Sequence, residues 1–315
     1  MNSTESGFAG RESRQEAISI VIPAKDEAGS LRWLLPEIRR QMPNAEILVV
    51  DDGSTDESVA VCHSENVRVI SHPYSMGNGA AIKTGARHAH GDLFVFMDAD
   101  GQHDPADIPR LLEKLGQGYE MTVGARHPSS QASFGRRGAN CFYNKLASAM
   151  TGHQIEDLTS GFRAVRARHF RKFLYLLPNG FSYPTTSTMA FFRSGFPVAY
   201  VPIHARKRET TGTSKIRIAQ DGFRFFIIIL KIGTLFSPMR LFLPLGAMLF
   251  FSGLGLYIYN YLSQGRFTNM SVFLLLSALF IFLIGILSEQ ISSLHYRGVE
   301  EDFRRTKRDN WRSGI

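Results

Sequence analysis

The sequence predicts an α/β domain with a mainly parallel sheet, followed by an interfacial helix and two transmembrane helices. Apolar β-rich runs alternate with helical patterns over the first half of the chain, which is typical of βαβ units. Residues 223–294 are strongly apolar, although the whole chain of 315 residues is only 44% hydrophobic. This length allows one sizeable core and an appendage.

Short apolar runs rich in β-branched residues predict five strands in the first half. These runs are Ile18–Pro23, Ala45–Val50, Val67–Ser71, Leu93–Met97 and Tyr119–Val123. Their spacing leaves room for one helix after each of the first four strands, as a parallel sheet requires.

Four helices are expected in these intervals. Ser30 is predicted to cap the first helix, and Ser54 or Thr55 the second. The third is expected over Asn78–His90, with small residues on much of its surface. The pair Asp104–Pro105 predicts a cap and a first helical residue for the fourth.

Charge and cysteine content restrict the class of partner. The net charge is +8, with seven Lys and Arg in residues 203–231 and six in residues 295–315. Both basic segments flank the apolar third, which favours anionic lipid, and no nucleic-acid partner is expected. Cys62 and Cys141 have neither metal-site nor disulfide spacing, which suits a reducing compartment. Residues 1–16 are polar and are predicted to be a disordered N-terminus without a signal peptide.

Two carboxylates one residue apart follow the fourth strand. Asp98 and Asp100 offer the hard oxygen ligands that Mg²⁺ and Mn²⁺ prefer, at a strand end where open α/β sheets bind ligands. Taken alone, this pattern is also a common surface turn. However, Asp51–Asp56 ends the second strand and Pro23–Glu27 ends the first, so three acidic strand ends are expected to form one crevice.

Other phosphate-binding motifs are missing from the expected places. No Gly-x-Gly-x-x-Gly follows the first strand, and there is no Walker phosphate loop, which argues against a dinucleotide or P-loop site. Asp52 is favoured as a ligand contact, whereas Ser54 and Asp56 are better explained as turn and cap residues.

Five motifs together resemble a known family. They are Pro23–Glu27, Asp51–Asp56, Asp98–His103, Val123–Arg126 and Asp157–Arg163, in that order. The chain is similar to the family 2 glycosyltransferases with the GT-A fold. More narrowly, it resembles the polyprenyl-phosphate glycosyltransferases over about residues 17–235. Asp26 stands where that family usually has Asn. The Gln-x-x-Arg-Trp motif of processive polysaccharide synthases is absent, which favours transfer of a single sugar.

The resemblance implies a donor site and a metal site. Asp98, Asp100 and Gln102 would hold Mg²⁺ or Mn²⁺ on the diphosphate of a nucleotide-sugar donor. Asp52 and Glu27 would contact the nucleoside. The implied cofactor-binding set is Pro23, Ala24, Asp26, Glu27, Asp52, Asp98, Arg208 and Lys215.

Asp100, Arg126 and Asp157 are the implied catalytic residues. Arg126 would bind phosphate, since its planar fork suits bidentate oxygens, and the alternative is a surface arginine at a strand end. Asp157 would orient the acceptor or hold Arg163. The pair at positions 136 and 137 is either a second site for acceptor phosphate or a solvated basic loop.

A basic loop precedes the apolar third. In Arg206–Lys215, Arg208, Ser214 and Lys215 match a family loop that would close over the donor and the lipid phosphate. A juxtamembrane polybasic segment is the alternative, and the two roles are compatible.

The apolar third predicts a membrane hairpin. Ile216–Leu235 contains Arg224 and Lys231, so it is expected to lie at the interface. Leu241–Leu262 has 22 residues without a charge, and at ~1.5 Å per residue it spans a ~30 Å hydrocarbon core. Ser271–Leu287 is the second span. Both basic flanks are expected on the cytoplasmic side by the positive-inside rule, which places both termini there.

The predicted organisation has five parts. They are a disordered N-terminus (1–16), a GT-A catalytic domain (17–215), a juxtamembrane amphipathic helix (216–238), a two-helix transmembrane hairpin (239–294) and a basic cytoplasmic tail (295–315). The family resemblance also allows a homo-oligomer such as a tetramer.

The expected function is inverting, metal-dependent transfer of one sugar to polyprenyl phosphate (undecaprenyl or dolichyl) at the cytoplasmic face of the inner membrane. A UDP-sugar donor is favoured, and GDP-mannose also fits the motifs. Two alternatives stay open: a membrane-bound nucleotidyltransferase, which also uses paired Asp and Mg²⁺, and a non-catalytic anchor on anionic lipid.

Overall fold

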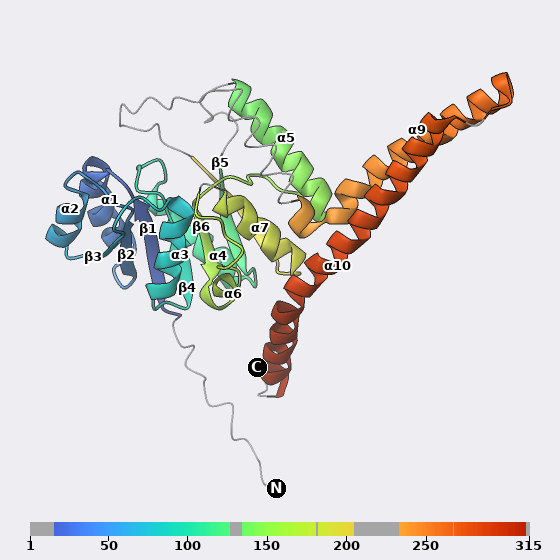
Figure 1. Cartoon of the computed structure of the whole chain (residues 1–315). Coiled ribbons are helices and arrows are strands. Elements are labelled where there is room, and N and C mark those ends of the chain that lie inside the picture. Colours follow the sequence, from blue (N-terminus) through green and yellow to red (C-terminus); the bar gives the residue numbers. More distant parts are fainter. Residues whose placement is uncertain (1–15, 127–133, 181, 205–232, 267, 313–315) are drawn as a thin grey trace, which may run out of the picture.

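The computed structural model describes residues 16–126, 134–180, 182–204, 233–266 and 268–312. The described part contains an α/β body and a long helical hairpin that projects from it (Figure 1). The juxtamembrane segment up to residue 232 and the N-terminal segment up to residue 15 lie outside the described residues.

A seven-stranded sheet forms the centre of the body, in the order β3-β2-β1-β4-β6-β5-β7. The strands are β1 (Ile18–Ala24), β2 (Glu46–Asp51), β3 (Arg68–Ser71), β4 (Leu93–Phe96), β5 (Met121–Arg126), β6 (Arg163–Arg166) and β7 (Val198–Ile203). Strand β6 runs antiparallel to both neighbours, β4 and β5, whereas the other pairs are parallel. The predicted mainly parallel sheet is therefore confirmed.

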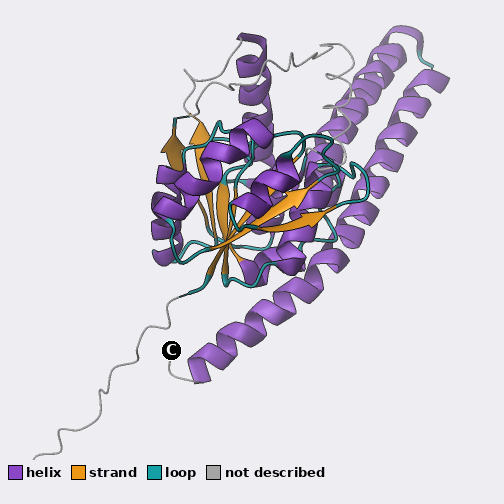
Figure 2. Ribbon diagram, turned by 90° about the vertical axis from the view of Figure 1, so that its left-hand side faces the viewer, coloured by secondary structure: helices purple, strands orange, loops and turns teal. Residues whose placement is uncertain are grey.

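Helices cover both faces of the sheet (Figure 2). Those of the body are α1 (Ala28–Gln41), α2 (Ser58–Ser64), α3 (Asn78–His88), the 3₁₀ turn η1 (Pro105–Asp107), α4 (Ile108–Gly116), α5 (Phe134–Thr151), α6 (Ala167–Lys172) and α7 (Tyr183–Arg193). Strand β1 is apolar except for Ser19, because both of its faces are covered. Val21 joins the core under α3, α6 and α7, while Ile20 and Ile22 join the core under α1 and α4.

The small residues of α3 bring this helix close to the sheet. A Cβ on Gly85 would lie 2.2 Å from Cγ1 of Val21, so only glycine allows this approach. The predicted helix is confirmed, although it ends at His88 and Ala89 continues in extended conformation.

Two predicted caps are wrong and one is confirmed. Helix α1 begins at Ala28, whose N–H donates to Oδ2 of Asp56 at 3.0 Å, so Ser30 lies inside the helix. Helix α2 begins at Ser58, which again uses Asp56. A carboxylate from a neighbouring loop thus serves both helix starts. Asp104 caps η1 as predicted by accepting from Ala106 N at 3.0 Å.

The hairpin consists of α9 (Pro238–Gln264) and α10 (Asn269–Arg312), which lie side by side in both views (Figures 1 and 2). Pro238–Ser263 and Asn269–Leu294 are long and apolar enough to cross a membrane. The helices pack through glycines, since a Cβ on Gly253 would lie 3.0 Å from Cβ of Leu274. Helix α10 continues without a break into the segment expected as a tail.

Candidate functional site

A crevice of about 510 Å³ opens at the carboxyl ends of the strands. Strand order reverses here, because β2 and β3 lie on one side of β1 and β4 lies on the other. Ligands of open α/β sheets bind at such a reversal. The lining residues come from the ends of β1, β2 and β4, from the start of α3, and from the segments before β6 and at the start of α7.

Asp98 and Asp100 line the crevice, and both are half-buried. Gly161 faces Asp98 so closely that an added Cβ would lie 2.6 Å from Oδ2 of Asp98. The backbone N–H of Gln102 donates to Oδ1 of Asp100 at 3.1 Å. Because residue 161 is a glycine, the Asp98 carboxylate can occupy its position in the crevice wall.

A metal ion at this place would depend on oxygens from a ligand. Among the described residues, no three His, Cys, Asp or Glu side chains are grouped as a metal cage. Two carboxylates suit Mg²⁺ bound through one or two protein carboxylates and the phosphates of a substrate. The residues present therefore fit a divalent ion that arrives with a diphosphate.

His103 follows the acidic pair in the chain. Its side chain is buried and stacks on Phe162 with ring centroids 5.0 Å apart. Burial lowers the pKa of His103 to about 4, although the nearby Asp100 charge acts in the opposite direction. The ring is therefore neutral at pH 7, and it packs on Phe162 without lining the crevice.

Asp52 is the centre of a polar network at the base of the crevice. Its carboxylate contacts His72 Nδ1 at 2.8 Å and accepts from Ser75 Oγ and from the backbone N–H groups of Met76 and Gly77. Burial raises the pKa of Asp52, but these hydrogen bonds outweigh it and hold the pKa below its usual value. Asp52 thus fixes the loop over residues 75–77, which lines the crevice.

His72 was not predicted from the sequence as a site residue. The parallel register pairs Asp51 with Ser71, so the next residues, Asp52 and His72, lie side by side at the ends of β2 and β3. A histidine directly after a predicted strand was the available signal, but only strand order identifies its partner.

The other residues predicted at the first strand end divide into two groups. Pro23, Ala24 and Glu27 line the crevice. Asp26 is not among the lining residues, because its carboxylate accepts from the N–H and the hydroxyl of Thr55 at 2.7 and 3.1 Å. Asp26 therefore joins two loops.

Asp157 pairs with Arg126 and not with Arg163, so of its two expected roles the contact with Arg163 is wrong, and orientation of the acceptor stays a prediction. Arg126 donates from Nε and Nη2 to the two carboxylate oxygens at 2.8 and 3.0 Å. Burial raises the pKa of Asp157, but the bonds from Arg126 outweigh it and lower the pKa. Arg163 is fully buried and donates to Pro184 O at 3.0 Å and Ser187 Oγ at 2.7 Å. Asp157 contacts Arg126 because the antiparallel pairing of β5 and β6 brings the end of β5 close to the segment before β6. Closeness in sequence to Arg163 does not decide the partner.

Some predicted residues lie outside the described part. Arg208 and Lys215 fall in the segment 205–232, and the side chains of Arg136 and Arg137 are not among those described. Their predicted roles stay predictions.

Two family models match the chain. The model described as "Glycosyl transferase family 2" matches residues 19–174. Residues 19–174 form a glycosyl transferase family 2 domain. The model described as "GtrB C-terminal hairpin" matches residues 237–294, the region of α9 and α10. The predicted family and enzyme class are confirmed.

Solved structures share the fold of this glycosyltransferase. One is glucosyl-3-phosphoglycerate synthase from Mycobacterium tuberculosis in complex with Mn²⁺ and UDP-glucose. It has 22% identity, covers 68% of this chain and 78% of its own, and gives a TM-score of 0.56. The same enzyme with Mn²⁺, UDP and glucosyl-3-phosphoglycerate gives 21% identity, the same coverages and a TM-score of 0.55. The likeness shows a GT-A-type fold.

Proposed function

We propose that this glycosyltransferase transfers one sugar from a nucleotide-diphosphate sugar to a polyprenyl phosphate at the cytoplasmic membrane face. The observation that carries the proposal is the combination of an acidic crevice at the sheet edge with two apolar helices in the same chain that are long enough to cross a membrane. A water-soluble acceptor would not require such a hairpin.

The donor is proposed to be a UDP-sugar held in the crevice. The structurally similar synthase binds UDP-glucose and Mn²⁺. The volume of about 510 Å³ suits a ligand of this size. The fixed loop over residues 75–77 and the carboxylate of Glu27 would form the nucleoside end. GDP-mannose is the alternative donor.

Asp98, Asp100 and Gln102 would hold the divalent ion. When bound, Mg²⁺ or Mn²⁺ supplies positive charge against the charge that develops on the leaving diphosphate. Asp98 is positioned for this role by Gly161, and Asp100 by the Gln102 N–H.

The acceptor phosphate is proposed as the nucleophile. Its second pKa is near 6, so at pH 7 it is largely dianionic and needs no general base. One phosphate oxygen bonds to the anomeric carbon as the bond from that carbon to the diphosphate breaks, with inversion and no net proton transfer. Arg126, held by Asp157 and one quarter exposed, would orient an acceptor phosphate oxygen.

The membrane arrangement follows from length and charge. Each apolar segment has 26 residues, about 39 Å at ~1.5 Å per residue, enough to cross a ~30 Å core with some tilt. Basic residues on both flanks favour the cytoplasmic side for the catalytic domain and both termini.

The test uses purified protein in detergent with undecaprenyl phosphate, Mg²⁺ or Mn²⁺, and a panel of radiolabelled UDP- and GDP-sugars. We expect organic-phase label from one donor, with release of the nucleoside diphosphate and loss of label in EDTA. Asp100→Ala should lower the label about 10³-fold, while the matched exposed-helix control Glu113→Gln should retain it.

Two results would overturn the proposal. Release of pyrophosphate instead of nucleoside diphosphate would indicate a nucleotidyltransferase. Absence of both label and nucleotide binding in folded protein would leave a lipid-surface anchor.

A further inference from the structure

Glu289 is the only charged residue between Met270 and Leu294, in the second apolar helix. Ionisable residues in such segments pair with a partner and mark functional positions. Glu289 Oε1 accepts from Arg193 Nη2 at 2.6 Å, and Arg193 is the last residue of α7. The other oxygen, Oε2, accepts from Met239 N at 3.4 Å. One carboxylate therefore joins the end of α7, the first turn of α9, and α10.

Further polar contacts hold the same junction. Ser292 Oγ of α10 donates to Leu235 O at 2.6 Å. Ser237 Oγ donates to Met150 O at 3.0 Å, and Arg240 Nη1 donates to Ala149 O at 2.6 Å. The last two carbonyls belong to the final turn of α5, where a cation is favourable. Both α5 and α7 thus end at the base of the hairpin (Figure 1).

The opposite end of α7 belongs to the crevice. Tyr183 and Pro184, its first two residues, line the cavity. Tyr183 is buried, and its hydroxyl donates to Gly161 O at 3.2 Å. Gly161 in turn abuts Asp98. A continuous chain of contacts therefore runs from Glu289 through α7 to Asp98.

The helix fixes the length of this chain. Tyr183 and Arg193 are ten residues apart, which is about 15 Å along an α-helix. The helix is packed along this length, because six of its inner residues, Thr186 to Phe191, are buried. Such a packed helix transmits a displacement at one end to the other.

We propose that α7 is a spacer that sets the crevice at a fixed place relative to the membrane hairpin, and that Arg193 and Glu289 are positioning residues for transfer to the membrane-bound acceptor. This inference rests on the proposed function. Neither residue touches a substrate. The pair acts by presenting the crevice to a phosphate that lies at the membrane surface.

The experiment compares Arg193→Gln, Glu289→Gln and the double variant, in vesicles with a long-chain polyprenyl phosphate and in solution with a short-chain prenyl phosphate. Each single variant should lower kcat/KM for the long-chain acceptor about five- to tenfold. The double variant should be no worse than either single one, since both remove the same contact. Donor KM and turnover of the soluble acceptor should stay unchanged.

The matched control is Arg168→Gln. The exposed side chain of Arg168 makes an ion pair with Glu120 at 3.5 Å, away from the junction, and its loss should leave both acceptors unaffected. Equal losses for long and short acceptors would reduce the pair to a purely structural role and overturn the proposal.

Hydrogen exchange separates this inference from the proposed function. Glu289→Gln should accelerate amide exchange at the last turn of α7 and the first turn of α9, but not in β1. Unchanged amide exchange in these turns would overturn the proposal that α7 is a spacer, whichever group the enzyme transfers. Accelerated exchange in a protein without lipid transfer would instead overturn the proposed function.

Discussion

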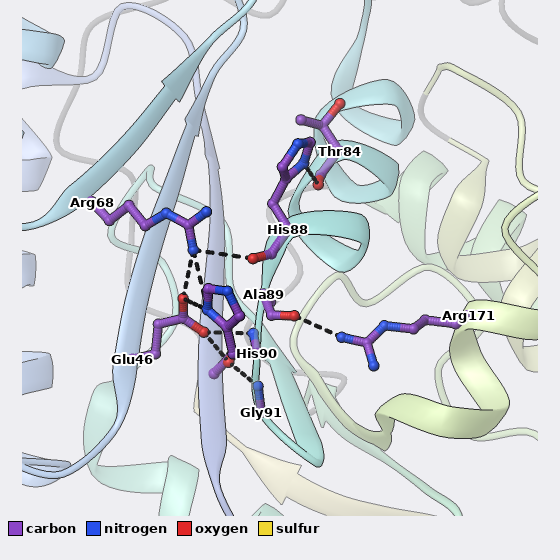
Figure 3. Close-up of polar contacts among 9 residues, drawn as sticks. Glu46, Arg68, Thr84, His88, Ala89, His90, Gly91 and Arg171 are labelled. Carbon is purple, nitrogen blue, oxygen red and sulfur yellow. Dashed lines mark hydrogen bonds and ion pairs between the residues drawn. The ribbon is translucent and has the colours of Figure 1, made fainter.

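The two edges of the sheet both carry clustered charge, and they differ in what their carboxylates face. At the amino edge, Glu46 of β2 accepts from the Ser19 hydroxyl, from Arg68 at 2.9 Å and from the backbone N–H of His90 at 2.8 Å (Figure 3). At the carboxyl edge, Asp98 and Asp100 line a cavity.

Neighbouring strands supply two of the donors at the amino edge, and the loop before β4 supplies the third through His90. Ser19 is the register partner of Glu46 on β1, and Arg68 comes from β3. Burial raises the pKa of Glu46, but the hydrogen bonds outweigh it and lower the pKa to about 2. A carboxylate held by several donors in this way stabilises the fold, whereas Asp98 and Asp100 lie in the wall of a crevice that a ligand can enter. Substitutions at the two edges should therefore affect different measurements.

The largest expected effect is at Asp100. Asp100→Ala should lower sugar transfer about 10³-fold, since removal of a metal-binding carboxylate withdraws several kcal/mol of transition-state stabilisation. The melting temperature in detergent should stay within a few degrees of the parent. A large fall in melting temperature would show that this edge is also structural.

Asp157→Asn should lower both the rate of sugar transfer and the melting temperature. It leaves the guanidinium of Arg126 without its counter-charge, which costs about 2–3 kcal/mol for a partly buried pair. The folded pKa of Asp157 is lowered, so its contribution is present above the unfolded pKa and declines as pH falls through the folded pKa. The gap in melting temperature between parent and variant should therefore narrow in acid. A gap that does not change with pH would contradict the pairing.

Gly161→Ala should affect activity without a charge change. The added Cβ would meet the Asp98 carboxylate at 2.6 Å, and a displacement of this kind costs up to about 10²-fold in rate. Steady-state kinetics with varied metal concentration should show a higher metal requirement. Gly116→Ala is the matched control, because nothing lies within 4 Å of its added Cβ.

The smallest effect is expected at the amino edge. Glu46→Gln should destabilise the protein by about 1–2 kcal/mol through weaker hydrogen bonds, with unchanged turnover per folded molecule. The unfolded pKa is 4.5 and the folded pKa about 2, so the stabilisation is full above pH 4.5 and is lost as pH falls toward 2. Thermal melting from pH 7 to pH 3 measures this. A loss of turnover at unchanged stability would remove the distinction between the edges.

The sequence by itself determined the alternation of strands and helices, the acidic strand ends and the two apolar helices. These features depend on local periodicity, on chain direction and on composition, which a neighbouring segment does not alter. The cap at Asp104 belongs here too, since it accepts from Ala106, two residues away.

Only the tertiary structure decided which distant groups meet. The donors at the starts of α1 and α2 turn to Asp56 instead of Ser30, Ser54 or Thr55. Asp52 meets His72 because β2 and β3 are neighbours. Asp157 meets Arg126, and Glu289 meets Arg193 across 96 residues. In each case the partner is set by strand order or helix docking, because a charged group is stabilised by what surrounds it in space, and sequence spacing does not encode that.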